Sequence, residues 1–290
     1  MSWNFAYDSP SAITALLEGE GLSMSKKFGQ NFLLSQQVRE RIVQELRIPD
    51  GGTVWEIGPG LGALTTLLVA RNAQVTAFEI DHGFCRILRE QAFVGDTNFR
   101  LVEGDVLKTW EQVSAADGIP DRICGNLPYN VGSVCIARFL EKQCLPERMV
   151  YTLQKEVADR LCADFGDKDW SSFTILAKID YEVELSFTIK SGAFYPSPNV
   201  TSAVIGMQRR KTPLVSPELR PIFLPMVKEL FAQRRKTVKN NLQHGKAGSL
   251  LGKAGVERLL ADCEVPPNER AERLDIPVLI RMAQHIASRV

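Results

Sequence analysis

One stretch of the chain reads as a β-strand that runs directly into a glycine-rich turn and then into a helix. Residues 53–57 (Thr-Val-Trp-Glu-Ile) favour a strand, residues 58–62 are Gly-Pro-Gly-Leu-Gly, and the apolar residues 63–70 favour a helix. Glycine adopts positive φ angles and lets the main chain approach a ligand closely. This order of elements is typical of a nucleotide-binding loop in an α/β fold.

A second predicted strand, residues 74–79, ends in Glu79, 21 residues after Gly58. A carboxylate at this spacing falls where the ribose hydroxyls of a bound nucleoside would lie. The alternative is a strand end whose acid simply faces water. The glycine loop upstream favours the binding site.

Strands and helices alternate over the first half of the chain. The predicted strands are residues 53–57, 74–79, 99–103, 121–125 and 148–153. This alternation predicts an α/β fold with a doubly wound, mostly parallel, Rossmann-like sheet, whose ligand crevice lies at the carboxyl ends of the strands. Residues 181–189 and 201–209 predict two later strands in an antiparallel hairpin.

An amide, a proline and an aromatic ring follow the fourth strand, in the sequence Asn126-Leu127-Pro128-Tyr129. The Asn126 side-chain oxygen can accept a hydrogen bond from an exocyclic amine, and we expect the Pro128 carbonyl to point inward as a second acceptor. Tyr129 offers a stacking face for a planar base. The alternative is a surface turn, since these residue types are common after strands.

Three other segments supply candidates for the same crevice. Asp105 follows the third strand and can accept from an adenine amine or cap the next turn. Residues 194–200 contain two prolines and predict a rigid extended loop with exposed aromatic rings, which presents Phe194 across the crevice from Tyr129. Lys26 and Lys27 begin a loop expected to touch an anion, with a plain basic loop as the alternative.

Charge is unevenly distributed along the chain. Residues 1–200 hold 19 Lys+Arg against 26 Asp+Glu, net −7, whereas residues 201–290 hold 16 against 8, net +8. The pattern changes to helices only from about residue 211, so we predict domains over residues 1–211 and 212–290. The most basic stretch is predicted to be a helix with Arg235 and Lys239 one turn apart. A polyanion partner and a solvated helical surface both explain this charge.

Composition narrows the class of protein. Hydrophobic residues make up 44% and charged residues 24%, as in ordinary globular proteins. The chain lacks an apolar run of 18 residues and a secretory signal pattern, so we expect a cytoplasmic protein with no membrane partner. Six cysteines without a C-x-x-C pair predict reduced, buried thiols, and three scattered histidines predict no metal site.

In combination, these motifs resemble those of one known family. The matching stretches are residues 27–33, 56–62, 79–81, 104–105, 126–130, 194–198 with Val200 and Ser202, and 234–237. They resemble the bacterial small-subunit (16S) ribosomal RNA adenine dimethyltransferases, the kasugamycin-resistance family, over nearly the whole chain. The chain departs from the family at Val131-Gly132-Ser133, expected to alter the mouth of the target pocket, and at residues 170–173, expected to alter RNA contacts.

The resemblance implies a role for individual residues in binding S-adenosyl-L-methionine, the target base and RNA. For the cofactor it implies Asn31 and Leu33 over the methionine end, Gly58 and Gly60 against the same end, Glu79 at the ribose, Asp105 at the adenine amine, Ile80 and Val106 on either side of the adenine ring, and a contact from Asn126. For the target base it implies Asn126, Pro128, Tyr129 and Phe194. For RNA it implies Lys26, Lys27, Arg234, Arg235, Lys236 and Lys239.

The resemblance also implies the reaction, which is transfer of methyl groups to the N6 amines of two adjacent adenines in a hairpin loop near the 3′ end of small-subunit ribosomal RNA. The product is N6,N6-dimethyladenosine, the partner is the assembling 30S subunit, and the expected protein is a metal-free monomer. Such a target has to be unpaired or flipped out of its stack.

Three rival functions remain open on the sequence. A nicotinamide-dependent oxidoreductase would use Gly58, Gly60 and Glu79, but the G-x-G-x-x-G spacing is missing and Asn126 would have no role. An RNA-binding assembly factor could carry a vestigial methyl-donor pocket. A large-subunit ribosomal RNA adenine methyltransferase is the nearest alternative among enzymes.

Overall fold

The chain divides into two compact units in the computed structural model, which describes residues 3–22, 31–128 and 131–289. The first unit comprises Met1–Ala158 and Val183–Arg209, and the second comprises Asp159–Glu182 and Arg210–Val290. The predicted boundary near Thr212 is close to the division at Arg209. Residues 159–182, expected in the first domain, belong instead to the second unit, because their apolar side chains pack with the C-terminal helices.

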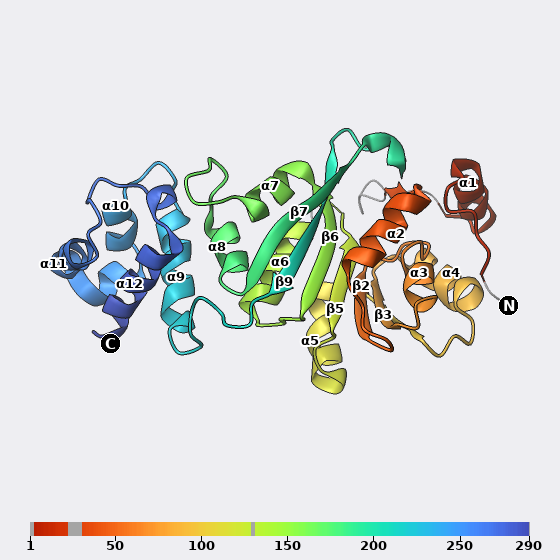
Figure 1. Ribbon diagram of the computed structural model, residues 1–290, viewed down its shortest axis with the longest axis horizontal. Coiled ribbons are helices and arrows are strands. Elements are labelled where there is room, and N and C mark those ends of the chain that lie inside the picture. Colours follow the sequence, from red (N-terminus) through yellow and green to blue (C-terminus); the bar gives the residue numbers. More distant parts are fainter. Residues whose placement is uncertain (1–2, 23–30, 129–130, 290) are drawn as a thin grey trace. The chain divides into compact units, whose positions relative to one another are not determined.

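A seven-stranded sheet organises the first unit (Figure 1). Its strands, in spatial order, are β4 (Phe99–Glu103), β3 (Gln74–Glu79), β2 (Thr53–Ile57), β5 (Arg122–Asn126), β6 (Arg148–Gln154), β9 (Ser202–Arg209) and β7 (Tyr181–Ile189). The strands β2 to β6 pair in parallel, and β9 runs antiparallel to β6. The predicted α/β fold with a mostly parallel sheet is confirmed.

The remaining elements of this part of the chain are helices and short connections. They are α1 (Pro10–Gly19), β1 (Phe32–Leu33), α2 (Gln36–Glu45), α3 (Thr65–Val69), α4 (His82–Ile87) with its π-helical continuation (Leu88–Ala92), α5 (Val106–Asp117), α6 (Gly132–Glu141), α7 (Lys155–Cys162), a 3₁₀ turn (Ser191–Ala193) and β8 (Phe194–Tyr195). The Ser35 hydroxyl caps α2 by accepting from Val38 N. An antiparallel pair forms between β1 and β8.

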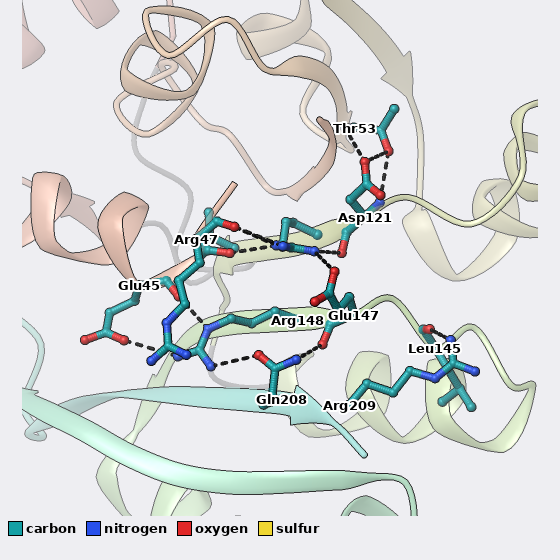
Figure 2. A network of polar contacts seen from close by, with 11 residues as sticks. Glu45, Arg47, Thr53, Asp121, Leu145, Glu147, Arg148, Gln208 and Arg209 are labelled. Carbon is teal, nitrogen blue, oxygen red and sulfur yellow. Dashed lines mark hydrogen bonds and ion pairs between the residues drawn. The ribbon is translucent and has the colours of Figure 1, made fainter. Parts of the chain in front are cut away.

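Two buried arginines fix the amino-terminal ends of the parallel strands (Figure 2). Arg122 and Arg148 are the first residues of β5 and β6. Arg122 donates to the main-chain carbonyls of Leu46 and Arg47, and Arg148 donates to that of Glu45. These carbonyls lie at the end of α2, where the helix dipole favours a positive charge. The strands are therefore anchored at the edge opposite to the one where a ligand is expected.

The second unit is mainly helical. It contains α8 (Ser172–Lys178), α9 (Arg220–Phe231), α10 (Val238–Gln243), α11 (Lys246–Asp262), a 3₁₀ turn (Ala271–Arg273) and α12 (Ile276–Ala287). Trp170 is 3% exposed in the core of this unit and donates from its indole nitrogen to the Leu274 carbonyl at 3.1 Å. The Trp170 ring therefore supports the helical core, and the expected effect of residues 170–173 on RNA contacts stays a prediction.

The most basic stretch is not a continuous helix. Helix α9 ends at Phe231, residues 232–237 form a turn, and α10 begins at Val238 after a Thr237 N-cap. The predicted alignment of Arg235 and Lys239 on one helix face is therefore wrong. The physical reason is a tertiary contact, since Val238 N donates to the carbonyl of Glu269 at 2.8 Å and starts a new helix there.

Three expectations from composition can be compared with the described residues. All six cysteines are free, and five of them are buried while Cys162 is partly exposed. Among the described helices, none is both long and apolar enough to cross a membrane. No group of three or more metal-ligating side chains gathers in the described part of the chain.

Candidate active site

A cavity of about 240 Å³ opens at the carboxyl ends of the parallel strands in the first unit. It is lined by every predicted cofactor or target residue that the structure describes: Asn31, Leu33, Gly58, Gly60, Glu79, Ile80, Asp105, Val106, Asn126, Pro128 and Phe194. Tyr129, Lys26 and Lys27 lie outside the described residues. The sequence motifs thus converge on one cavity, although they come from widely separated segments.

The glycine loop gives the cavity a wall of bare main chain. Gly58 and Gly60 have φ angles of +68° and +58°, which side chains rarely adopt. A Cβ atom built on Gly58 would meet no protein atom within 4 Å. Since Gly58 lines the cavity, the loop leaves open space against its main chain, as a closely held ligand requires.

Glu79 ends β3 inside this cavity and is only 5% exposed, so the alternative of a water-facing strand end is wrong. Its carboxylate accepts from Gly60 N at 3.0 Å and from Ile80 N and Asp81 N at 2.9 Å each. Burial raises the pKa of Glu79, and these three donors oppose that rise. The acid therefore fixes the glycine loop as well as facing the cavity.

Glu56 is a second buried acid in the cavity lining, and the sequence assigned it no role. Its carboxylate accepts from the Thr65 hydroxyl at 2.6 Å. Burial raises the pKa of Glu56 to about 7, and the nearby Glu79 carboxylate adds to the rise. The available signal was the position of Glu56 near the end of β2, just before the glycine loop. The sequence pattern of a strand does not by itself reveal that both faces of β2 are covered by other parts of the chain.

Asp105, Ile80 and Val106 form another side of the cavity. Asp105 caps α5 through Oδ1, which accepts from Leu107 N at 3.0 Å, and no described residue donates to its Oδ2. Ile80 is 44% exposed, while Val106 is buried. Capping and ligand binding, weighed as alternatives for Asp105, are compatible because they use different oxygens.

Asn126 ends β5 with a fixed amide orientation. Its Nδ2 donates to the Asn31 main-chain carbonyl at 2.9 Å, and Oδ1 accepts from no described residue. Pro128 differs from expectation, because its carbonyl accepts from Val131 N at 3.0 Å and Gly132 N at 3.1 Å and so closes the first turn of α6. With two donors already on that oxygen, its prediction as a free inward acceptor is wrong.

Phe194 lines the cavity but is only 3% exposed. It is the register partner of Leu33 in the β1–β8 pair, which buries its ring among apolar side chains of the core. The predicted loop of exposed aromatics is therefore wrong for Phe194. Only a small part of its surface is available to a ligand.

Several cavity residues were missed by the sequence reasoning. Tyr7, Ile13, Phe32 and Phe84 all line the cavity, and the rings of Phe32 and Phe84 meet edge to face at 5.8 Å. Phe32 lay inside a motif already singled out. Tyr7 and Ile13 carry no motif signal, because one belongs to an irregular segment and the other to the apolar face of α1.

The predicted RNA-binding residues near the C-terminus are in the second unit, and they differ in whether their charges are paired with an acid of the described chain. Arg234 donates to the Lys168 carbonyl at 3.1 Å and pairs with Glu272, and Lys239 pairs with Glu257 at 2.7 Å. The exposed Arg235 and Lys236 form no ion pair within the described chain. These two residues are therefore the free positive charges of the turn.

Solved structures share this fold. The chain is similar to a dimethyladenosine transferase from Plasmodium falciparum, with a TM-score of 0.73, 21% identity, and coverage of 88% of this chain and 97% of that chain. It is also similar to the 23S rRNA methyltransferase ErmE, with a TM-score of 0.64, 25% identity, and coverage of 88% and 99%. The fold and the glycine-loop pocket define a Rossmann-like methyltransferase.

Sequence comparison identifies the family. The model of the family described as "Ribosomal RNA adenine dimethylase" matches residues 21–276. The chain is 42% identical over 238 residues to the "Ribosomal RNA small subunit methyltransferase A" of Treponema denticola, covering 81% of this chain and 80% of that protein. The chain belongs to the ribosomal RNA adenine dimethylase family. It is an enzyme of the methyltransferase class, so the oxidoreductase alternative is wrong.

Proposed function

We propose that this enzyme uses S-adenosyl-L-methionine to methylate the N6 amines of adenines in small-subunit ribosomal RNA and forms N6,N6-dimethyladenosine. The observation that carries the proposal is the single cavity in which the glycine loop, two strand-end acids and Asn126 meet. The small-subunit target rests on the relative from Treponema denticola, whose identity of 42% exceeds the 25% of the 23S enzyme. We extend the target to two adjacent adenines in a hairpin loop near the 3′ end.

The residues of the cavity fit this cofactor. The bare main chain at Gly58 and Gly60 suits the methionine end, together with Asn31 and Leu33. Glu79 has an acceptor position left beside its three main-chain donors, which suits a ribose hydroxyl. When bound, S-adenosyl-L-methionine supplies an electrophilic methyl group on a sulfonium.

The adenine part of the cofactor requires a flat apolar slot with a polar end. Exposed Ile80 and buried Val106 supply apolar surfaces, and the free Oδ2 of Asp105 supplies an acceptor for an amine. A purine ring buried there would cover the Ile80 side chain. The exposed apolar surface of Ile80 thus suits a site that the adenine ring covers when the cofactor is bound.

At the target amine, the chain supplies alignment. The N6 lone pair of adenine is conjugated into the ring, so acceptors on the amine hydrogens favour a pyramidal nitrogen with an available lone pair. Asn126 Oδ1 accepts one hydrogen because Nδ2 is held by Asn31. We assign the second acceptor to the Leu127 carbonyl, since Leu127 lines the cavity and no described residue donates to that oxygen. Positioning of this kind contributes up to roughly 7–11 kcal/mol.

The target base and its RNA require contacts outside the amine site. Tyr129 remains the proposed stacking residue on sequence grounds, and Phe194 lines the cavity with little of its ring exposed. Arg235 and Lys236 are proposed phosphate contacts, with Lys26 and Lys27 as further sequence-based candidates. The proposal includes a metal-free monomer that acts in the cytoplasm on the assembling 30S subunit.

Methylation mapping on ribosomal particles tests this function. Unmethylated small subunits and large subunits are incubated separately with the pure enzyme and labelled S-adenosyl-L-methionine, and modified adenines are located by mass spectrometry. We expect dimethylated adenines in one small-subunit hairpin loop only. Label in large-subunit RNA would favour the rival target, and subunit binding without label would favour an assembly factor.

A further inference from the structure

The N-terminal arm, residues 3–20, forms part of the cavity wall although it precedes the family match, which begins at residue 21. It consists of an aromatic segment followed by α1. Tyr7 and Ile13 of the arm line the cavity beside the glycine loop, and both are buried. The pocket is therefore incomplete without residues from outside the matched region.

The Tyr7 hydroxyl is the centre of a buried hydrogen-bond network. Its single proton is shared between the Leu61 carbonyl and the Thr66 hydroxyl oxygen, each at 3.0 Å, and its oxygen accepts from the Trp3 indole at 2.9 Å. The Thr66 hydroxyl in turn donates to the Gly62 carbonyl at 2.9 Å. The network thus holds the main chain at the two residues that follow Gly60.

The main chain at Gly62 leaves no room for a side chain. Gly62 has a φ angle of +89°, and a Cβ atom there would lie 2.9 Å from the Phe93 ring. Burial raises the pKa of Tyr7 to about 12, so the phenol stays protonated and remains a donor at working pH. The Arg39 guanidinium lies over the Tyr7 ring, 5.2 Å from its centre.

Other contacts attach the arm independently of Tyr7. Glu20 pairs with Arg86 at 2.9 Å and accepts from Gln91 at 2.6 Å. The Thr14 and Tyr195 hydroxyls are 2.9 Å apart. Removing the Tyr7 hydroxyl alone therefore leaves the arm in place and isolates its effect on the loop.

We propose that Tyr7 is a positioning residue of the cofactor site, whose hydroxyl holds the Leu61–Gly62 end of the glycine loop so that Gly58 and Gly60 face the ligand. The inference rests on the proposed use of S-adenosyl-L-methionine. It assigns a role in cofactor affinity to a segment outside the residues that define the family match.

The test compares Tyr7→Phe with the parent enzyme by calorimetry with S-adenosyl-L-methionine. Loss of one buried hydrogen-bond centre should raise the dissociation constant about tenfold, with kcat at saturating cofactor within about threefold of the parent. The control is Tyr195→Phe, which loses an arm contact by the same chemical change without touching the glycine loop. Its dissociation constant should stay within about twofold of the parent.

The possible results distinguish a failure of the proposed function from a failure of the positioning role of Tyr7. A parent enzyme that binds no S-adenosyl-L-methionine refutes the proposed function and this inference with it. Normal parent binding, with unchanged affinity in Tyr7→Phe and only a lower melting temperature, refutes the positioning role alone, as does an equal loss in Tyr195→Phe. If Tyr7→Phe does not fold, Thr66→Val has to show the same selective loss of affinity, and its failure to do so overturns the inference.

Discussion

Replacing Glu79 by Gln tests the cofactor site with minimal change of shape. In the parent, the carboxylate accepts from the main-chain nitrogens of Gly60, Ile80 and Asp81 at 2.9–3.0 Å. An amide keeps one oxygen acceptor and turns an NH2 group toward one of these donors. The substitution removes the charge-assisted bond proposed for the ribose, about 1.5–3 kcal/mol, which corresponds to roughly 10–150-fold in the dissociation constant.

Calorimetry with S-adenosyl-L-methionine measures this loss, and thermal melting records the accompanying cost to the fold. Glu103→Gln is the matched control, because Glu103 is the register partner of Glu79 at the end of the adjacent strand but does not line the cavity. Glu103 instead pairs with Arg89. Affinity within twofold of the parent in Glu79→Gln would refute the ribose assignment, and an equal loss in both variants would make the effect nonspecific.

The other predictions concern pH, RNA and the target base. Burial raises the pKa of Glu56 from its ordinary value of 4.5 to about 7 in the fold. Between these two pH values the folded state keeps a proton that the unfolded chain has lost. The free energy of unfolding should therefore fall by about 3 kcal/mol from pH 4.5 to 7. Denaturant unfolding of Glu56→Gln should show that much less loss, and an equal pH slope in both proteins would contradict this. Replacing Arg235 and Lys236 together by Ala should flatten the salt dependence of subunit binding by about two phosphate contacts. The Lys239 ammonium pairs with a glutamate, so Lys239→Ala should change this salt dependence less. A parental salt slope in the double variant would remove the turn from the RNA surface. Tyr129→Ala should lower kcat/KM on RNA by roughly 5–150-fold, the equivalent of 1–3 kcal/mol of stacking, while Tyr129→Phe retains most activity; a severe loss with Phe would assign a role to the hydroxyl.

The sequence predicted the sheet well where local and tertiary preferences agree. The strands β2, β3 and β4 begin and end at the predicted residues. The glycine loop and the acids at the strand ends also lie together as expected, because the carboxyl ends of parallel strands meet at one edge. Spacing along the chain is enough to predict this convergence.

The sequence failed where tertiary contacts decide the outcome. Composition favoured a helix through Arg235, but a hydrogen bond from Val238 to Glu269 begins a new helix after a turn. Pairing of β1 with β8 buries Phe194, which its proline-rich context made look exposed. The carbonyl of Pro128 is used by the start of α6.

The N-terminal contribution to the site was hidden for a different reason. Tyr7 belongs to an irregular segment without periodicity, and its partners Leu61 and Thr66 are more than fifty residues away in the sequence. A contact of this kind depends on the folded positions of both segments. No local pattern predicts it.

Single-turnover methyl transfer by Asn126→Ala tests the central claim, that this amide accepts a hydrogen bond from the reacting amine. Asn126 Oδ1 accepts from no described residue, so its loss should leave the dissociation constant for S-adenosyl-L-methionine within a few-fold of the parent. The rate of methyl transfer to bound small subunits should fall by ~10²-fold or more. Equal losses in affinity and rate would show that Asn126 mainly supports the cofactor loop through Asn31, and a parental rate would remove it from the chemistry.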